Sequence, residues 1–585
     1  MLENTLAAPF ARGPILGSLG ITDTRLKGGL ILLVCLWLVL VVILPVGSLL
    51  IKSFQNSQGA FIGLANYAAY FQSPALSCSM ANSLATAGIT TLISVTLGFM
   101  MAWALTRTCI PAKGVFKGIA LMPLFAPTLL NGIILIYLFG RKGLITKGFF
   151  GLIPGLKIPL YGPVGIVISE VIYTFPQAML ILSIALGVTD ARLYEAARSL
   201  GAGRLRIFFT VTLPSIKYGL ISAIFVCFIL AFTDFGAPKI VGGNFNILAT
   251  DIYKQVIGQQ NFTMGAVVGV ILLIPTLAAF VLDRIIQKRQ VALIAAKSVP
   301  MVPRPHKLVD GAALLFCLAL AALVVCFYAT GLFAALVKVW PYDLSLGLGH
   351  FKFTGTGGGG YGAFCNSLGM AFYSALFGTA ITFFSAYLIE KAQCLRPLRR
   401  MAYFLSTLPL ALPGLVIGLA YIFFFNAPGW KIGGLFLPNP FQGLYGTMGI
   451  LVLSNLVHFY TVGFLSATTA LKQLDIEFEQ VADTMGVPFY RTLCRVTLPV
   501  CLPAVLEVGI YYFVNSMATV SAVIFLYSAD LPLAAVAIAN MDDAGDVAPA
   551  CAMSVLVLGT NIIVRLIYAL VTGKIRKKSM AWARA

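Results

Sequence analysis

The chain has 585 residues, of which 59% are hydrophobic and 10% are charged, and its mean hydropathy is +0.94. A water-soluble core cannot absorb so much apolar sequence, so this composition excludes a soluble globular protein and predicts a membrane protein with many spans. The formal net charge of +20 would suggest nucleic acid in a soluble chain. In a membrane protein, Lys and Arg gather in cytoplasmic loops that face anionic lipid. We therefore expect the lipid bilayer, and no nucleic acid, as a partner.

Apolar stretches of spanning length recur along the whole chain. About 20 residues of helix cross the hydrocarbon core of a bilayer, and each stretch has roughly that length. The predicted fold class is therefore an all-α membrane protein with about 12 transmembrane helices. The expected spans are residues 30–51, 82–105, 116–139, 163–187, 215–233, 264–283, 311–337, 367–389, 403–426, 446–468, 503–527 and 549–572. The first span is long enough to be retained as a helix, so no cleavable signal peptide is expected.

The distribution of basic residues sets the expected orientation. With the N-terminus in the cytoplasm, most of the 40 Lys and Arg residues fall in cytoplasmic loops, as the positive-inside rule requires. Both termini are then cytoplasmic. The loop of residues 141–157 is an exception to this rule. Its four basic residues would lie outside, and they are Arg141, Lys142, Lys147 and Lys157. A positive vestibule for an anionic solute is one interpretation of this loop.

The chain repeats itself at a separation of 284 to 286 residues. Matching landmarks are residues 82–84 with 366–368 (Asn-Ser-Leu), Pro123 with Pro409, Pro127 with Pro413, Gly132 with Gly418, and residues 211–214 with 496–499 (Val-Thr-Leu-Pro). Such constant spacing indicates two fused halves. Each half holds six spans, an even number, so both insert the same way up and the repeats are parallel.

The repeat and the charge pattern predict five segments. A basic, proline-bearing stretch joins the two halves and is typical of a cytoplasmic linker. The segments are a cytoplasmic N-terminus (1–29), a first half (30–283), a cytoplasmic linker (284–310), a second half (311–572) and a basic cytoplasmic C-terminus (573–585).

A polar phrase interrupts each half between its fourth and fifth spans. In the first half it reads EAARSLGAG from Glu195. Asp190 is a plausible N-cap, Leu193, Ala197 and Leu200 fall on one helical face, and the glycines from Gly201 stop the helix. Such a short amphipathic helix can lie on the lipid surface or dock into a partner's groove. The duplication favours docking, because two equivalent knobs suit a two-fold partner.

The first phrase resembles the EAA loop of binding-protein-dependent ABC transporter permeases, in which Glu-Ala-Ala-x3-Gly is followed by a proline. Glu195, Ala196, Ala197, Gly201 and Pro214 match that pattern in full. In the family this loop is the coupling helix that seats in the ATPase subunit. The resemblance therefore implies an ATPase dimer as a cytoplasmic partner and one cytoplasmic coupling-helix loop in each half.

The second phrase, QVADTMGVP, departs from the family pattern. Ala482, Gly486 and Pro499 are kept, whereas Gln480 stands where glutamate is expected. Glu479, one residue earlier, is a candidate substitute for the missing glutamate. We expect a docking helix in both halves, with a contact at Gln480 that differs from the one at Glu195.

Two fused halves resemble the permeases that import ferric iron, thiamine or 2-aminoethylphosphonate. Within that group, residues 232–262, 337–346 and 539–550 look most like the 2-aminoethylphosphonate permeases. The resemblance implies a periplasmic solute-binding protein, a place in the bacterial cytoplasmic (inner) membrane, and no cofactor in this chain. The sequence contains no G-x-x-x-x-G-K-[ST] motif to cradle ATP phosphates, so ATP and Mg are expected in the partner ATPase.

Ionisable and polar groups within spans are expensive and are therefore candidates for the solute path. In the fourth span these are Glu170 and Tyr173, and the matching residues of the tenth are Asn455 and His458. Asp234 ends the fifth span, and Glu507 lies inside the eleventh, near its start. The alternative for each is an interhelical polar contact that only holds the bundle together.

Two other classes of function remain open from the residues. An ion-coupled secondary transporter with parallel halves would need buried coupling carboxylates, but would not need two docking helices. A membrane scaffold or receptor would carry no solute. The eleven cysteines form no C-x-x-C pair, and no metal-ligand cluster or nucleophile–base pair is evident. Neither a metal site nor a catalytic residue is predicted, so the chain is not expected to be an enzyme.

Overall fold

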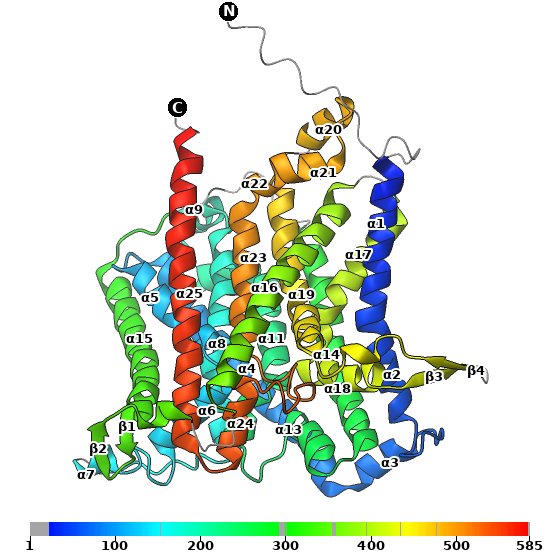
Figure 1. Ribbon diagram of the computed structural model, residues 1–585. Coiled ribbons are helices and arrows are strands. Elements are labelled where there is room, and N and C mark those ends of the chain that lie inside the picture. Colours follow the sequence, from blue (N-terminus) through cyan, green and yellow to red (C-terminus); the bar gives the residue numbers. More distant parts are fainter. Residues whose placement is uncertain are drawn as a thin grey trace, which may run out of the picture.

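Helices running between two ends make up almost all of the computed structural model (Figure 1). The structure describes residues 23–152, 154–291, 299, 301–353, 359–392, 395–432, 435–475 and 477–582. Most of the expected N-terminus (1–29) and part of the linker (284–310) lie outside the described residues, as do the last three residues of the chain.

The first half contains eight longer helical segments and several short ones. The longer segments are α1 (Asp23–Leu38), α2 (Leu44–Ser53), α4 (Pro74–Arg107), α5 (Lys113–Leu121), α6 (Thr128–Phe139), α8 (Pro163–Gly187), α11 (Leu213–Thr233) and α14 (Phe262–Val291). The short ones are α3 (Ala65–Gln72), α7 (Gly148–Gly151), α9 (Ala191–Ser199), α10 (Arg204–Ile207), α12 (Gly236–Val241) and α13 (Leu248–Tyr253).

The second half repeats this order and adds two small hairpins. Its longer helices are α15 (Lys307–Leu336), α16 (Gly360–Lys391), α17 (Arg396–Thr407), α18 (Gly414–Phe425), α19 (Met448–Lys472), α23 (Leu502–Ala518) and α25 (Val547–Trp582). The short ones are α20 (Glu477–Thr484), α21 (Phe489–Thr492), α22 (Leu498–Val500) and α24 (Ala534–Asp543). The antiparallel hairpins pair β1 (Val337–Val339) with β2 (Asp343–Leu346) and β3 (Gly429–Ile432) with β4 (Leu435–Pro438).

Within the described residues, nine helices are long and apolar enough to cross a membrane, or up to twelve if each of three bent pairs counts as one span. The all-α membrane fold is thereby confirmed. Two expected spans are not straight, however. The helix pair that covers span 116–139 is bent by 102°, and the pair that covers span 403–426 is bent by 110°.

Prolines explain both bends. Pro127 and Pro413 lack a donor N–H and push the preceding residue out of the helical region. Ala126 accordingly has φ −91° and ψ 141°, and Leu412 has φ −95° and ψ 115°. The eleventh expected span (503–527) also ends early, because α23 stops at Ala518 and is followed by turns.

The Asn-Ser-Leu landmark has the same structural role in each half. The Asn82 side chain donates to the Asn246 carbonyl at 3.0 Å, and the Leu248 amide donates to Ser83 Oγ at 2.8 Å. In the second half the corresponding bonds join Asn366 to the Pro532 carbonyl at 3.1 Å and the Ala534 amide to Ser367 Oγ at 2.8 Å. The motif therefore joins α4 to the start of α13 in the first half and α16 to the start of α24 in the second.

The first helix of each half packs on the other half. α1 contacts α16 and α17, α2 contacts α18, and α15 contacts α5 and α6. The buried apolar side chains of α15 join the cluster that holds most of the buried apolar residues of the first half together with most of those of α24 and α25. Those of α1 join a cluster made mainly of second-half residues. Two tyrosines bond across these contacts: Tyr421 Oη donates to the Val41 carbonyl, and Tyr328 Oη to Asn131 Oδ1, both at 2.9 Å. The halves are therefore interlocked.

The bends also bind the halves together. The Ala411 carbonyl at the second bend accepts from Thr276 Oγ1 of α14 at 3.1 Å. The Phe125 carbonyl at the first bend accepts from Asn561 Nδ2 of α25 at 2.9 Å. Each broken helix thus has a freed carbonyl satisfied by the last helix of the opposite half.

Replacing Thr276 with valine should weaken the contact between the halves. Valine keeps the buried shape but removes the hydroxyl that bonds the Ala411 carbonyl, and one such bond between membrane helices contributes about 1 kcal/mol. We expect Thr276→Val to lower the thermal unfolding midpoint of the purified protein, and Thr276→Ser, which keeps the hydroxyl, to lower it less. Equal midpoints for the valine variant and the unmodified protein would contradict this role.

Candidate functional site

The first polar phrase forms the short helix α9, as its capping pattern predicts. The Arg192 amide donates to Asp190 Oδ1 at 3.0 Å, so Asp190 is the N-cap. The helix ends with Gly201 at φ +72°, and the Ala202 amide donates to the Ala197 carbonyl at 3.0 Å. A left-handed residue followed by such a backward bond is the usual glycine-dependent helix end.

The second phrase folds in the same way as α20. Gly486 has φ +67°, and the Val487 amide donates to the Ala482 carbonyl at 2.9 Å. A Cβ at Gly201 or Gly486 would meet no atom within 4 Å. Backbone conformation alone therefore calls for glycine at these two positions. We refer to residues 188–207 and 473–492 as the first and second coupling loops.

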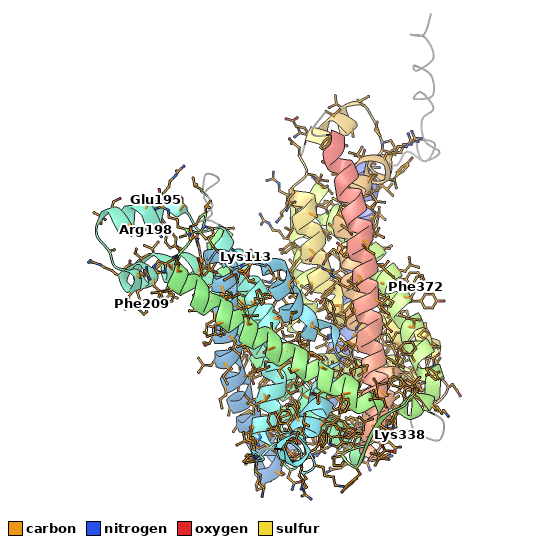
Figure 2. All side chains as sticks on the ribbon, turned by 90° about the vertical axis from the view of Figure 1, so that its left-hand side faces the viewer. Lys113, Glu195, Arg198, Phe209, Lys338 and Phe372 are labelled. Carbon is orange, nitrogen blue, oxygen red and sulfur yellow. The ribbon has the colours of Figure 1, made fainter. Side chains whose placement is uncertain are left out.

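Both coupling loops lie at the same end of the molecule, together with the start of α1 and the end of α25 (Figure 1). Figure 2 shows the first loop, with Glu195 and Arg198, standing out from the bundle at the end opposite Lys338. Large apolar side chains are exposed at equivalent positions of the two loops. Leu200 is 86% exposed and Met485 is 71% exposed, and Leu193 and Phe478 are also exposed.

A basic residue at the end of α4 or α16 contacts the inward-facing side of each coupling loop. Arg107 of α4 lies 5.1 Å from the ring centre of buried Tyr194 and donates to the Leu186 carbonyl at 2.8 Å. In the second half, Lys391 of α16 lies 3.2 Å from Glu479 Oε2. The second loop therefore replaces a cation–π contact with an ion pair.

This pairing corrects the expected role of Glu479. Its side chain is only 12% exposed, and it occupies the place of Tyr194 rather than that of Glu195. Glu195 and Gln480 are both exposed at equivalent positions, so no glutamate replaces Glu195 in the second loop. The remaining residues of the family pattern lie within the loops or just after them. Ala196 is exposed on α9, Pro214 is in the first turn of α11, and Pro499 is in α22.

A cavity of about 290 Å³ lies between the two halves. Its walls come from both bent helices, from α8 and α19, and from the ends of α11 and α23. Equivalent positions of the two halves line it, for example Tyr173 and His458, and Asp234 and Thr519. The cavity therefore lies on the approximate two-fold axis that relates the repeats.

Three of the five predicted path residues line this cavity, namely Tyr173, Asp234 and His458. Glu170 and Asn455 are buried but are not among the lining residues. Glu170 Oε2 accepts from Thr90 Oγ1 at 3.0 Å, which joins α8 to α4. The interhelical alternative therefore describes Glu170 better than a place on the path. Glu507 pairs with Arg565 at 2.8 Å, also away from the cavity.

Several polar lining residues were missed from the sequence: Gln177, Asp283, Tyr511 and Asn515. For two of these residues, their spacing from a tyrosine in the sequence could have identified them. Gln177 follows Tyr173 by one helical turn, and Asn515 follows Tyr511 in the same way, so each pair shares a helix face. Asp283 had been assigned to the end of the sixth span.

The lining offers acidic groups, hydroxyl groups and one imidazole, but no Lys or Arg. Among the described residues that line the cavity there are two carboxyl groups, from Asp234 and Asp283, two phenols and one imidazole, with no Lys or Arg. Asp234 also has a structural role, because its Oδ2 accepts from the Ala237 amide at 3.0 Å at the start of α12. No group of three or more His, Cys, Asp or Glu side chains that could hold a metal ion occurs in the described part of the chain.

Comparison with known proteins shows the family. The family described as the inner membrane component of binding-protein-dependent transport systems matches residues 94–292 and 367–577. The chain belongs to this family. The two matched regions lie one in each half, so the expected ABC permease resemblance and the duplicated architecture are confirmed.

Two relatives of this permease carry the names of ferric transporters, and others are named for molybdenum or sulfate transport. A ferric transport system permease protein, FbpB, of Actinobacillus pleuropneumoniae is 26% identical over 85% of this chain and 71% of its own length. A provisionally assigned one, FbpB 1, of Haemophilus influenzae is 28% identical over 77% of this chain and 70% of its own length. A solved bacterial ABC importer of alginate covers 46% of this chain and 96% of its own at 16% identity and a TM-score of 0.39.

The cavity wall of this permease depends on close backbone approach at Gly236. A methyl group there would overlap Thr128 Oγ1 and lie 3.0 Å from the Leu129 amide nitrogen. We expect Gly236→Ala to destabilise the protein by about 1–3 kcal/mol, the usual cost of overpacking, and to reduce transport.

The matched control is Gly118→Ala in α5, where an added Cβ would meet nothing within 4 Å. Thermal unfolding in detergent compares the two variants. Similar unfolding midpoints for the two variants would show that the cavity wall accommodates a methyl group at Gly236 without loss of stability.

Proposed function

We propose that this permease is the membrane subunit of an ABC importer that moves a small solute inward by alternating access. The observation that carries the proposal is the pair of equivalent coupling loops at one end of a bundle whose halves enclose a cavity. A separate ATPase dimer would dock on the loops and bind ATP and Mg. Its closing on ATP binding would move the two halves relative to each other.

The proposed orientation places the coupling loops in the cytoplasm. The start of α1 and the end of α25 lie at that same end, which fits cytoplasmic termini. The opposite end carries α3, α13, α24 and the β1–β2 hairpin, and it is where a periplasmic solute-binding protein would deliver its cargo. An ion-coupled secondary transporter is the weaker candidate, because it has no use for two equivalent docking helices.

For the solute, ferric iron is the first candidate and 2-aminoethylphosphonate the second. Carboxylate and phenol oxygens are hard ligands, which suit a highly charged hard cation, and the cavity supplies two of each. The names of the two ferric relatives point the same way. The second candidate rests on the similarity of residues 232–262 and 539–550 to phosphonate permeases. Its ammonium group is also compatible with the two carboxyl groups.

Docking is tested at the exposed apolar residues of the loops. Leu200→Asp and Met485→Asp place a charge on the surface that would enter the ATPase groove, where an unpaired charge is costly. We expect each to reduce binding of the purified ATPase at least tenfold, which corresponds to about 1.4 kcal/mol. Leu346→Asp, at an exposed leucine of β2, is the control at the other end. Unchanged binding by both loop variants would refute the docking proposal.

The solute is tested by uptake in cells that carry the complete transporter or lack this gene. We expect loss of labelled ferric iron uptake without the gene, with labelled 2-aminoethylphosphonate as the parallel measurement. Loss of phosphonate uptake alone would overturn the first candidate and support the second.

Asp234→Asn separates the role of charge in the cavity from the role in capping. Asparagine still accepts at a helix N-terminus, so the fold should persist, while one negative charge is lost. Either candidate solute carries positive charge, so we expect uptake to fall about tenfold, equivalent to about 1.4 kcal/mol. Asp234→Ala should in addition lower thermal stability. Full uptake by the asparagine variant would show that Asp234 is only a cap.

A further inference from the structure

The two coupling loops have the same shape and similar exposed apolar residues, but opposite exposed charge. Arg192 of α9 is replaced by Glu477 at the equivalent position of α20, and Arg198 is replaced by Asp483. All four side chains are exposed. Two positive charges in one loop thus correspond to two negative charges in the other, around the shared apolar positions Leu200 and Met485.

Glu195, which lies between Arg192 and Arg198 in the chain, reduces the difference in charge between the two loops but does not cancel it. Glu195 is exposed on α9, and its equivalent Gln480 is neutral. An arginine of the linker, Arg304, lies 3.9 Å from Glu195 and is itself 76% exposed, so it returns a positive charge to the first loop.

The flanking segments show part of the same contrast. The first loop continues with exposed Arg204 and Arg206, whereas the second has buried Phe489 in place of Arg204 and an exposed arginine, Arg491, in place of Arg206. Lys27 lies 3.6 Å from Asp483 and offsets part of the negative charge of the second loop. The Lys391–Glu479 pair is buried behind α20 and adds little to the exposed rim. The described surface of the first loop is therefore basic, and that of the second is acidic.

We propose that an ATPase homodimer docks unequally on this permease, with one subunit held more tightly than the other by the charge around the apolar contact. The inference rests on the proposed function, because it concerns the partner of the same loops. Identical subunits present identical grooves, and one rim charge cannot complement both a basic and an acidic loop. The apolar residues supply the contact common to both sites, and the rim charges set the difference between them.

The test exchanges the two equivalent charges in the full-length permease in lipid nanodiscs. Arg192→Glu gives the first loop the charge of the second, and Glu477→Arg does the reverse. Binding of the purified ATPase is measured for each variant at low and high ionic strength. We expect affinity to change in opposite directions, by about threefold each, whichever sign the groove carries. The double variant, which only exchanges the charges, should bind nearly as the unmodified protein does.

Ionic strength and a distant charge provide the controls. The changes in affinity caused by Arg192→Glu and by Glu477→Arg should both be smaller in high salt, because exposed charges are screened. Lys338→Glu changes the net charge of the chain equally at the opposite end, as Figure 2 shows, and should leave binding unchanged. A change in the same direction for both loop variants, or no change for either, would overturn unequal docking. If Leu200→Asp still abolished binding in that case, the importer proposal would stand.

Discussion

A backbone carbonyl released by a broken helix inside an apolar bundle must find a donor, because lipid and apolar side chains offer none. This permease breaks its third helix in each half, at Pro127 and Pro413. In an unbroken helix the carbonyl of Phe125 would accept from the amide four residues later. Here it accepts from Asn561, and the carbonyl of Ala411 accepts from Thr276. Each donor belongs to the opposite half, so neither bend is satisfied until the halves come together.

The bends in turn create the cavity, since their residues form its walls. The same contacts that satisfy the backbone therefore place the two halves around a solute-sized space. They also explain why the halves exchange their first helices. α15 completes the first half and α1 the second, so the structural bodies differ from the halves of the sequence.

Each exchanged helix also reaches the coupling loop of the half on which it packs. His306, at the start of α15, lies 2.7 Å from Arg204 of the first loop. Lys27 of α1 lies close to Asp483 of the second. A force applied by an ATPase to one loop therefore acts on a body that includes a helix from the other half of the sequence. The linker also contacts the first loop, because the Val299 carbonyl accepts from the Ala191 amide at 2.9 Å.

The features predictable from sequence were those with a local cause. The cap at Asp190, the glycine stops at Gly201 and Gly486 and the repeat all depend on residues close together in the chain, and the structure contains each as expected. The bends were missed although the prolines were recognised, because length and hydropathy are the same for a straight and a broken span. The path residues were only partly predictable. Glu170 and Asp234 are both acidic residues of long apolar stretches, and only packing decides that one faces Thr90 and the other the cavity.

Both halves have a close backbone approach at the cavity wall, but the glycine that permits it lies on opposite sides of the contact in the two halves. In the first half the glycine of the contact is Gly236, against Thr128 of the bent helix. In the second half the glycine is on the bent helix, as Gly414, and the hydroxyl is on the other side, as Ser521. The small residue has changed sides while the spacing was kept. The polar groups of the cavity follow no such rule, since the equivalent of Asp234 is Thr519 and that of Tyr173 is His458. A cavity with two-fold geometry and unequal chemistry therefore presents a different surface on each side, with Asp234 on one and Thr519 on the other.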